Sequence, residues 1–123
     1  MTMLSPTRQA VPVLEGLTLL HRGKVRDSYR LDTTPPRRLV CTTDGVSIFD
    51  FVLNALVPDK GRVLNALSRF WLQVLEQHGV PTHFERFGEG IDEFLPPHLR
   101  NNPDLQSRAM VVMPLNMQPV EFI

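Results

Sequence analysis

The chain has 123 residues, of which 42% are hydrophobic, and its 13 basic side chains balance 13 acidic ones. This length suits one compact domain, and the zero net charge excludes a global attraction to nucleic acid or to a membrane surface. No apolar run approaches the ~20 residues of a membrane-spanning helix, so we expect no nucleic-acid or membrane partner. The single cysteine, Cys41, excludes an intrachain disulfide, which fits a cytoplasmic chain. Eleven prolines against seven glycines predict a loop-rich fold rather than a helical bundle.

The first elements predicted along the chain are three short strands. Residues 1–16 hold two prolines and mixed polarity, and we expect them to form an N-terminal arm. Apolar runs and alternation predict strands at 17–21, 25–31 and 38–42, joined by turns into an antiparallel meander. Asp27 interrupts the apolar alternation of the second strand, because this charged residue falls on the apolar face.

The clearest predicted element is a helix from about Lys60 to His78. Apolar residues recur there every three or four positions. Asp59 is placed to cap its N-terminus, and Gly79 is placed to end it in the left-handed conformation. We expect the apolar stripe of this helix to cover one face of the sheet. The stripe consists of Val63, Leu67, Phe70, Trp71, Val74 and Leu75.

The remaining sequence predicts further strands around a long loop. A strand is expected at 82–87, a loop with at most one helical turn at 88–107, and apolar strands at 109–115 and 119–123. Together the elements predict an α+β fold over 17–123, an antiparallel β-sheet with one long flanking helix. Because the chain stops inside the last expected strand, we expect a fragment of a longer protein.

The segment Arg22-Gly-Lys-Val-Arg-Asp27 is the first of three candidate binding motifs. Lys24 and Arg26 are two residues apart, so on a strand they would point to one side, about 6.6 Å apart. That separation suits two neighbouring phosphates, each met by its own cation, and Gly23 would let the backbone approach a ligand closely. An ordinary strand edge with solvated charges is the alternative interpretation.

The second motif is residues 43–50, where Asp44 and Asp50 bracket a serine and a phenylalanine. Two carboxylates could hold Mg²⁺ or a substrate amine, but Asp and Ser also form ordinary turns.

The third motif lies at the start of the predicted helix, at Lys60 and Gly61. Backbone N–H groups and the helix dipole favour an anion there, and the lysine would reinforce this preference.

Four collinear stretches carry a resemblance to a known family. They are Gly-Lys-Val-Arg-Asp-Ser-Tyr at 23–29, Thr-Asp-Gly-Val-Ser-Ile-Phe-Asp at 43–50, Pro-Asp-Lys-Gly-Arg-Val-Leu-Asn-Ala-Leu-Ser-Arg-Phe-Trp at 58–71, and Met-Val-Val-Met-Pro-Leu-Asn-Met-Gln-Pro-Val-Glu at 110–121. In this order and spacing they resemble the N-terminal portion of SAICAR synthetase (phosphoribosylaminoimidazole-succinocarboxamide synthase). The resemblance implies a kinase-like N-terminal lobe that holds ATP, truncated here before the second lobe.

This family joins L-aspartate to carboxyaminoimidazole ribonucleotide in purine synthesis, with ATP and Mg²⁺. The resemblance implies phosphoryl transfer to the ribonucleotide carboxylate, followed by attack of the aspartate amine on the acyl phosphate. ATP and the two substrates are therefore the expected partners, and a homo-oligomer is left open. The resemblance places the metal ligands and much of the catalytic machinery beyond Ile123. A non-catalytic nucleotide-binding or interaction module is the alternative.

The resemblance also assigns ATP contacts to residues of this chain. It implies that Lys24 and Arg26 contact the phosphates, that backbone groups near the end meet adenine, and that the helix start adds a second phosphate-side contact. The expected ATP contacts are Lys24, Val25, Arg26, Lys60, Gly61, Met113, Leu115 and Met117.

A substrate-side loop is the other implied part of the site. It consists of Asp44, Ser47, Phe49 and Asp50. The sequence departs from the family at Gly45, where an arginine is usual, and at Met113-Pro114, where two lysines are common. The first departure removes an anion contact, whereas backbone recognition of adenine survives the second.

Overall fold

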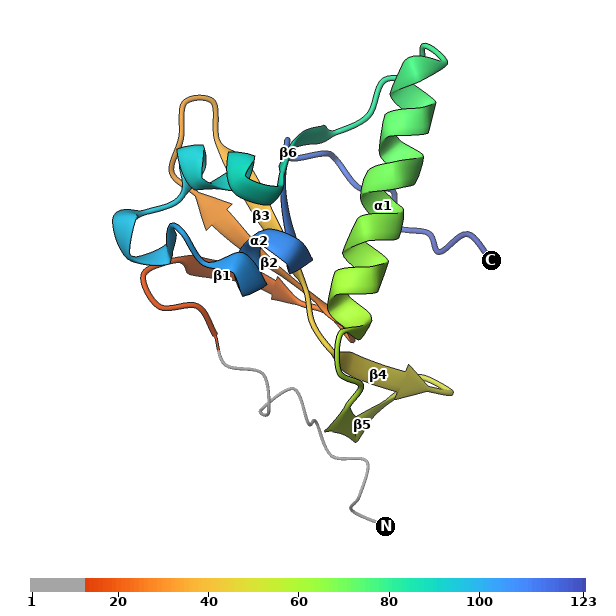
Figure 1. The fold of residues 1–123 in the computed structure, drawn as a ribbon. Helices are drawn as coiled ribbons and strands as arrows, with labels where there is room; N and C mark the ends of the chain where they lie inside the picture. The colour runs from red at the N-terminus through yellow and green to blue at the C-terminus, as the bar shows by residue number, and fades with distance from the viewer. Residues whose placement is uncertain (1–12) are drawn as a thin grey trace.

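The computed structural model describes residues 13–123, which form a five-stranded sheet beside one long helix (Figure 1). The strand order is β1-β2-β3-β7-β6, and every neighbouring pair is antiparallel. The strands are β1 (Thr18–Arg22), β2 (Arg26–Leu31), β3 (Arg37–Thr42), β6 (Phe84–Phe87) and β7 (Ala109–Val112). The predicted α+β class and the meander of the first three strands are both confirmed.

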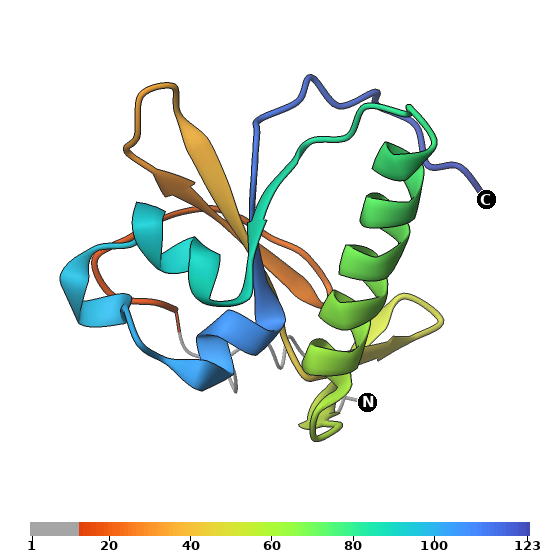
Figure 2. The same cartoon turned by 45° about the horizontal axis from the view of Figure 1, so that its top comes forward.

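The sheet has two apolar faces, because successive side chains of a strand point to opposite sides. The larger core comprises Tyr29, Leu31, Leu39, Cys41, Ile91, Leu95, Leu99, Leu105, Ala109 and Val111. Three short helices supply its outer side: η2 (Gly88–Phe94), η3 (Pro97–Leu99) and α2 (Pro103–Arg108). On the opposite face, Phe87, Met110 and Val112 pack with Leu72 of helix α1 (Lys60–Gln77). Figure 2 shows the short helices and α1 on opposite sides of the sheet.

Residues 43–50, predicted as a turn, instead begin a second, two-stranded sheet. Strands β4 (Gly45–Ile48) and β5 (Phe51–Leu56) pair antiparallel as a hairpin below α1 in Figure 1. Phe49 and Asp50 form its turn with left-handed φ angles of 50° and 67°. The sequence signal for such a turn is glycine or asparagine, and neither occupies these positions, which is why the pattern did not predict the hairpin.

The C-terminal third also differs from the prediction. Residues 88–107, predicted as a loop, hold η2, η3 and most of α2, whose start is capped by the Asn102 side chain. The strand predicted at 109–115 ends at Val112, and residues 119–123 form no strand, so that part of the prediction is wrong. Prolines recur in this last segment, and each removes an N–H that a strand ladder needs.

Helix α1 begins at Lys60, as predicted, but another side chain caps it. Asp59 has a left-handed φ of 64°, and its side chain makes no capping hydrogen bond. Asp44 takes that role, because its Oδ1 accepts a hydrogen bond from the Gly61 N–H at 2.8 Å. The predicted end is confirmed, since Gly79 follows the helix with a φ of 80°. Among residues 13–123, no helix is both long and apolar enough to cross a bilayer.

The apolar stripe of α1 faces away from the sheet, so the prediction that it covers the sheet is wrong. The buried residues of the helix are Gly61 and Asn65, while Trp71 in the stripe is 60% exposed. Asn65 Nδ2 donates to the carbonyl oxygens of Ser107 and Ala109, at 3.1 and 3.3 Å. The first half of the helix thus approaches the sheet through small and polar residues, and Leu72 follows on the same face, about 140° around the helix axis from the stripe.

A buried ion pair explains how Asp27 is accommodated on the apolar face of β2. Asp27 is 1% exposed, and both of its carboxylate oxygens accept hydrogen bonds from Arg22, at 3.1 and 3.3 Å. Such bidentate pairing compensates the cost of burying the charge.

Most of the predicted arm lies outside the described residues, and near its end the Leu14 N–H donates to Tyr29 Oη at 3.2 Å.

Gly61→Ala tests the close approach of α1 to the sheet. A methyl group at Gly61 would overlap the Thr42 carbonyl oxygen and lie 2.6 Å from Arg108 Nη1. We expect the free energy of unfolding to fall by about 1–3 kcal/mol, although alanine otherwise favours a helix by about 1 kcal/mol. Urea unfolding measures the difference. Gln73→Ala on the exposed side is the control, expected within about 0.5 kcal/mol of the parent. A Gly61→Ala protein as stable as the parent would contradict the steric argument.

Candidate functional site

The first candidate motif forms the turn between β1 and β2. The Gly23 N–H donates to the Arg26 carbonyl oxygen at 2.8 Å, which closes the turn around Lys24 and Val25. A Cβ at Gly23 would lie 2.9 Å from that same oxygen, so glycine is required for this closure. Lys24 lies in the turn and Arg26 is the first residue of β2, so the prediction that both lie on one strand is wrong. Both side chains are exposed.

Lys24 forms an exposed ion pair with Asp50 at the tip of the β4–β5 hairpin. The hydrogen bond to Asp50 raises the pKa of Lys24, and the charge of Glu121 adds a smaller effect in the same direction. The same hydrogen bond lowers the pKa of Asp50. The structure therefore brings a residue predicted at the ATP phosphates against one predicted in the substrate-side loop.

Thr43 holds the Lys24 turn against the loop that follows β3. Its N–H and its Oγ1 both donate to the Val25 carbonyl oxygen, each at 2.8 Å. The same Oγ1 accepts a hydrogen bond from the Gly45 N–H at 3.2 Å. Because Thr43 is buried, these bonds are shielded from water, and the position of the turn is fixed relative to the start of the hairpin.

Asp44 joins the loop after β3 to both α-helices. Its Oδ1 accepts hydrogen bonds from the Gly61 N–H at 2.8 Å and from Arg108 Nη1 at 2.9 Å. Burial acts to raise the pKa of Asp44, but the hydrogen bonds from Arg108 and Gly61 outweigh it and lower the pKa. Arg108 also donates to the Thr42 carbonyl oxygen at 3.2 Å and to Asp104. Burial acts to lower the pKa of Arg108, yet its two carboxylate partners raise it overall.

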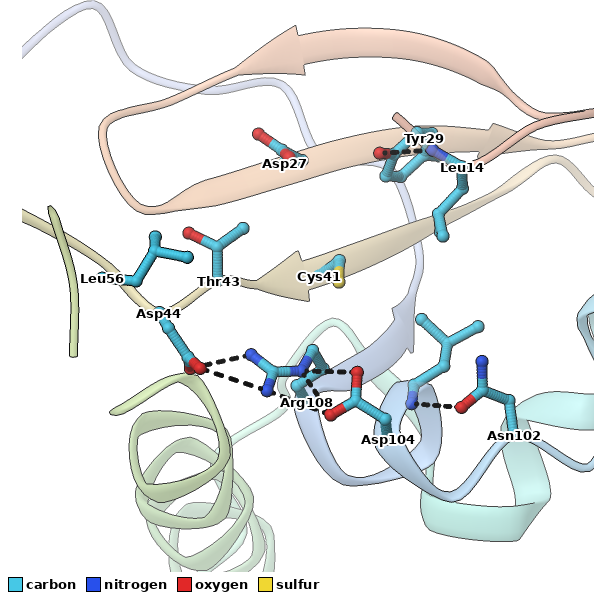
Figure 3. Close-up of a pocket in the computed structure, with 11 residues that line it drawn as sticks. Leu14, Asp27, Tyr29, Cys41, Thr43, Asp44, Leu56, Asn102, Asp104 and Arg108 are labelled. Atoms are coloured by element: carbon cyan, nitrogen blue, oxygen red, sulfur yellow. Dashed lines mark hydrogen bonds and ion pairs between the residues drawn. The ribbon is translucent and has the colours of Figure 1, made fainter. Parts of the chain in front are cut away.

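A cavity of about 280 Å³ opens beside this charged cluster (Figure 3). The sheet contributes Tyr29 and Cys41 to its lining, together with Asp27. Arg26 directly precedes Asp27 along β2, so its side chain points to the other face of the sheet. The residues that line the cavity include none of the predicted ATP contacts. We therefore treat it as separate from the predicted nucleotide site.

Lys60 and Gly61, the third motif, both contact the loop after β3. Lys60 Nζ donates to the Gly45 carbonyl oxygen at 2.9 Å, and the Gly61 N–H donates to Asp44. These contacts give both residues a structural role at the start of α1. Their assignment to the ATP phosphates stays a prediction.

The predicted adenine contacts follow β7 and lie in a segment without regular structure. The Met113 N–H donates to the His83 carbonyl oxygen at 2.8 Å, and a backbone contact of Met113 with adenine stays a prediction. Leu115 is exposed, and Met117 is 78% exposed. This segment leaves the sheet and passes to the α1 side in both views of the fold (Figures 1 and 2).

The substrate-side loop is divided between a strand and a turn. Ser47 lies in β4, whereas Phe49 and Asp50 form the hairpin tip, where Phe49 is 91% exposed.

Sequence reasoning missed Arg108, which pairs with Asp104 four residues earlier in α2. A four-residue spacing of opposite charges predicts an ion pair on a helix, but it does not predict that Arg108 also reaches Asp44, 64 residues away in the sequence.

Comparison with known proteins identifies the family. A sequence profile of SAICAR synthetase matches residues 19–123. Phosphoribosylaminoimidazole-succinocarboxamide synthase of Schizosaccharomyces pombe is 37% identical over 108 residues, which cover 86% of this chain and 34% of that protein. The protein of the same name from Pelobacter propionicus is 42% identical over 109 residues, which cover 88% of this chain and 34% of that protein.

The fold agrees with this comparison. The solved SAICAR-synthase of Saccharomyces cerevisiae, complexed with SAICAR, superposes with a TM-score of 0.70 at 34% identity. The superposition covers 81% of this chain and 34% of that chain. The antiparallel sheet, its flanking helix and the four collinear motifs thus define a lobe of the kind that enzyme contains. The chain belongs to the SAICAR synthetase family, within its N-terminal portion, and spans about a third of the length of these relatives.

The pH dependence of stability tests the Asp44 cluster. Because the folded-state pKa of Asp44 lies below its ordinary value of 3.8, its contribution is complete above that pH and disappears as the pH falls through the folded-state pKa. At pH 7 we expect Asp44→Asn to lower the free energy of unfolding by about 1.5–3 kcal/mol. The difference from the parent should shrink below about pH 4, measured by urea unfolding between pH 7 and 3.

Asp32→Asn is the matched control, because Asp32 is exposed and paired with Arg30 at the surface. We expect it to change stability by less than about 0.5 kcal/mol at either pH. If Asp44→Asn were equally neutral at pH 7, the cluster would have no role in holding α1 to α2.

Proposed function

We propose that the chain is the ATP-binding lobe of a ligase that joins L-aspartate to carboxyaminoimidazole ribonucleotide and forms SAICAR. Family membership supports this reaction. The observation that most directly supports nucleotide binding is the basic turn between β1 and β2, in which Lys24 and Arg26 are both exposed beside Gly23. Two exposed cations this close in the sequence could each meet a phosphate of one polyphosphate.

The proposed chemistry has two steps. A carboxylate oxygen of the ribonucleotide attacks the γ-phosphorus of ATP, ADP leaves, and an acyl phosphate forms. The amine of L-aspartate then attacks the acyl carbon, loses a proton, and expels phosphate to give the amide. Lys24 and Arg26 would hold the phosphates and neutralise charge that develops on them. The lobe needs no nucleophilic side chain for this, because its contribution is positioning and electrostatics.

Mg²⁺ would supply further neutralisation of the ATP phosphates. Within residues 13–123, no three His, Cys, Asp or Glu side chains converge into a metal-binding group. Mg²⁺ is commonly held by substrate phosphates and one or two carboxylates. We therefore assign its binding to the phosphates themselves and to the portion of the family beyond this lobe.

ATP binding would require an exchange of anions at Lys24. Asp50 holds the lysine in the structure, and a phosphate oxygen would replace this carboxylate. The exchange would release the hairpin tip for the substrate side, where Asp44, Ser47 and Phe49 complete the proposed loop. ATP, aspartate and the ribonucleotide are the proposed partners, in the cytoplasm.

Substitution of Lys24 tests the phosphate role. We expect Lys24→Ala to weaken ATP binding by about tenfold to a hundredfold, since a charge-assisted hydrogen bond is lost. Lys24→Arg should recover part of the affinity, because the charge remains while reach and geometry differ. Isothermal titration of the 123-residue chain with ATP and Mg²⁺ measures both dissociation constants.

Two further variants show whether Lys24 makes a specific phosphate contact or only adds positive charge that attracts ATP. Arg30→Ala removes an exposed cation from the other end of β2 and should leave ATP affinity unchanged. Asp50→Asn removes the competing carboxylate and should tighten ATP binding by about twofold to fivefold. Equal affinities of the parent and Lys24→Ala would remove the phosphate role from Lys24.

A separate prediction concerns turnover. We expect the 123-residue chain alone to form no SAICAR from ATP, L-aspartate and carboxyaminoimidazole ribonucleotide. One lobe cannot surround the phosphates or exclude water from the acyl phosphate. A steady-state product assay decides this, and clear turnover by the chain alone would show that the lobe needs no complement.

A further inference from the structure

The outer face of α1 carries a row of large apolar side chains that the nucleotide proposal does not use. We call this row the α1 stripe. Its exposed members are Val63, Leu67, Phe70, Trp71 and Leu75. The Phe70 and Trp71 rings pack edge to face, with centroids 5.0 Å apart. Single exposed apolar residues are ordinary, but a continuous row of them marks an interaction surface.

A second exposed apolar segment follows β7 on the same side of the sheet. Its members are Leu115, Met117, Val120, Phe122 and Ile123. Both views show this segment and the β4–β5 hairpin extending past the sheet on the side of α1 (Figures 1 and 2). The α1 stripe and this segment thus lie on one side of the lobe.

The opposite side of the lobe is already covered. The short helices η2, η3 and α2 bury Ile91, Leu99 and Leu105 against the larger core. The related Saccharomyces cerevisiae chain shares this lobe over only 34% of its length, so about two thirds of that chain lies outside the shared part. A polypeptide of that size must pack against the lobe somewhere, and burying apolar surface is the main favourable contribution to such packing.

We propose that the α1 stripe is the docking surface for the portion of the SAICAR synthetase fold that lies beyond this lobe. Phe70 and Trp71 would be its central anchors, since aromatic side chains dominate the binding energy of packed interfaces. The stripe then explains why α1 approaches its own sheet through Gly61, Asn65 and Leu72 and keeps its aromatic side chains outward. The proposal rests on family membership and is independent of nucleotide binding by Lys24.

Thiol labelling of the stripe tests this proposal. Leu67→Cys places a reactive thiol in the stripe, and Gln73→Cys places one on the exposed polar side of the same helix. The native Cys41 is buried and serves as an internal reference. Each variant is compared in two proteins: the 123-residue chain alone, and a fusion of this chain to the remaining portion of the Saccharomyces cerevisiae enzyme. A maleimide and mass spectrometry give the labelling rates.

We expect the fusion to slow labelling of Leu67→Cys by about tenfold or more, because a covered thiol reacts only through local opening. Labelling of Gln73→Cys should stay the same in both proteins. Equal rates for Leu67→Cys in the two proteins would overturn the proposal, whatever the effect of Lys24→Ala on ATP binding. Slowing of both variants to the same extent would also overturn it, because protection would then not be specific to the stripe.

A second copy of the chain is the alternative occupant of the α1 stripe, and measuring self-association tests it. Leu67→Glu introduces a charge into the stripe, and Gln73→Glu introduces the same charge on the polar side. The proposal predicts that Leu67→Glu lowers the thermal midpoint of the fusion, while Gln73→Glu does not. A chain that is dimeric alone, and made monomeric by Leu67→Glu, with no stripe protection in the fusion, would assign the surface to a second copy instead.

Discussion

The carboxylate of Asp44 accepts hydrogen bonds from the first turn of α1 and from Arg108 at the end of α2, and the arrangement of the lobe depends on this junction. The Asp44 carbonyl oxygen also receives the Val57 N–H at 2.8 Å, at the close of the β4–β5 hairpin. One residue therefore sets the positions of two helices and the hairpin relative to β3. Arg108 completes the junction by reaching the Thr42 carbonyl oxygen, so the end of β3 and the start of β7 are tied together.

The proposed phosphate site depends on that junction indirectly. Thr43, next to Asp44, holds the Val25 carbonyl oxygen with two hydrogen bonds and so sets where the Lys24 turn lies. The hairpin that begins at Gly45 then carries Asp50 to the lysine. Lys24 and Asp50 are exposed and exchangeable, whereas Asp44 and Arg108 at the junction are largely covered and paired with each other. This division is what a site needs if a ligand is to replace one partner without disturbing the scaffold.

Local sequence patterns predicted the elements that local interactions determine. Alternation located β2, the spacing of apolar residues located α1, and a glycine located its end at Gly79, because neighbouring residues decide these features. The direction in which α1 presents its stripe could not be predicted this way. It follows from the contact of Gly61 with Thr42 and from the Asn65 hydrogen bonds to residues more than 40 positions later.

In the candidate site, too, the residue types could be predicted from the sequence but their geometry could not. The glycine and basic residues around Lys24 could be identified from the sequence, and the comparisons confirm the family that they indicated. Its geometry was not visible, because the hairpin turn at Phe49 and Asp50 uses left-handed residues without glycine. The partner of Asp44 was also hidden, since Arg108 reads locally as part of a surface ion pair in α2.

Contacts along α1 are graded from one end to the other. The buried residues, Gly61 and Asn65, both lie in the first two turns, while the far end touches the sheet mainly through Leu72. With 18 residues the helix is about 27 Å long, so a rotation of about 5° at its fixed end moves the other end by about 2 Å. Because the Asp44 junction holds the first turn of α1, a small change in the angle of the helix at that junction would displace Leu75 and Gln77 more than it displaces the residues beside the hairpin.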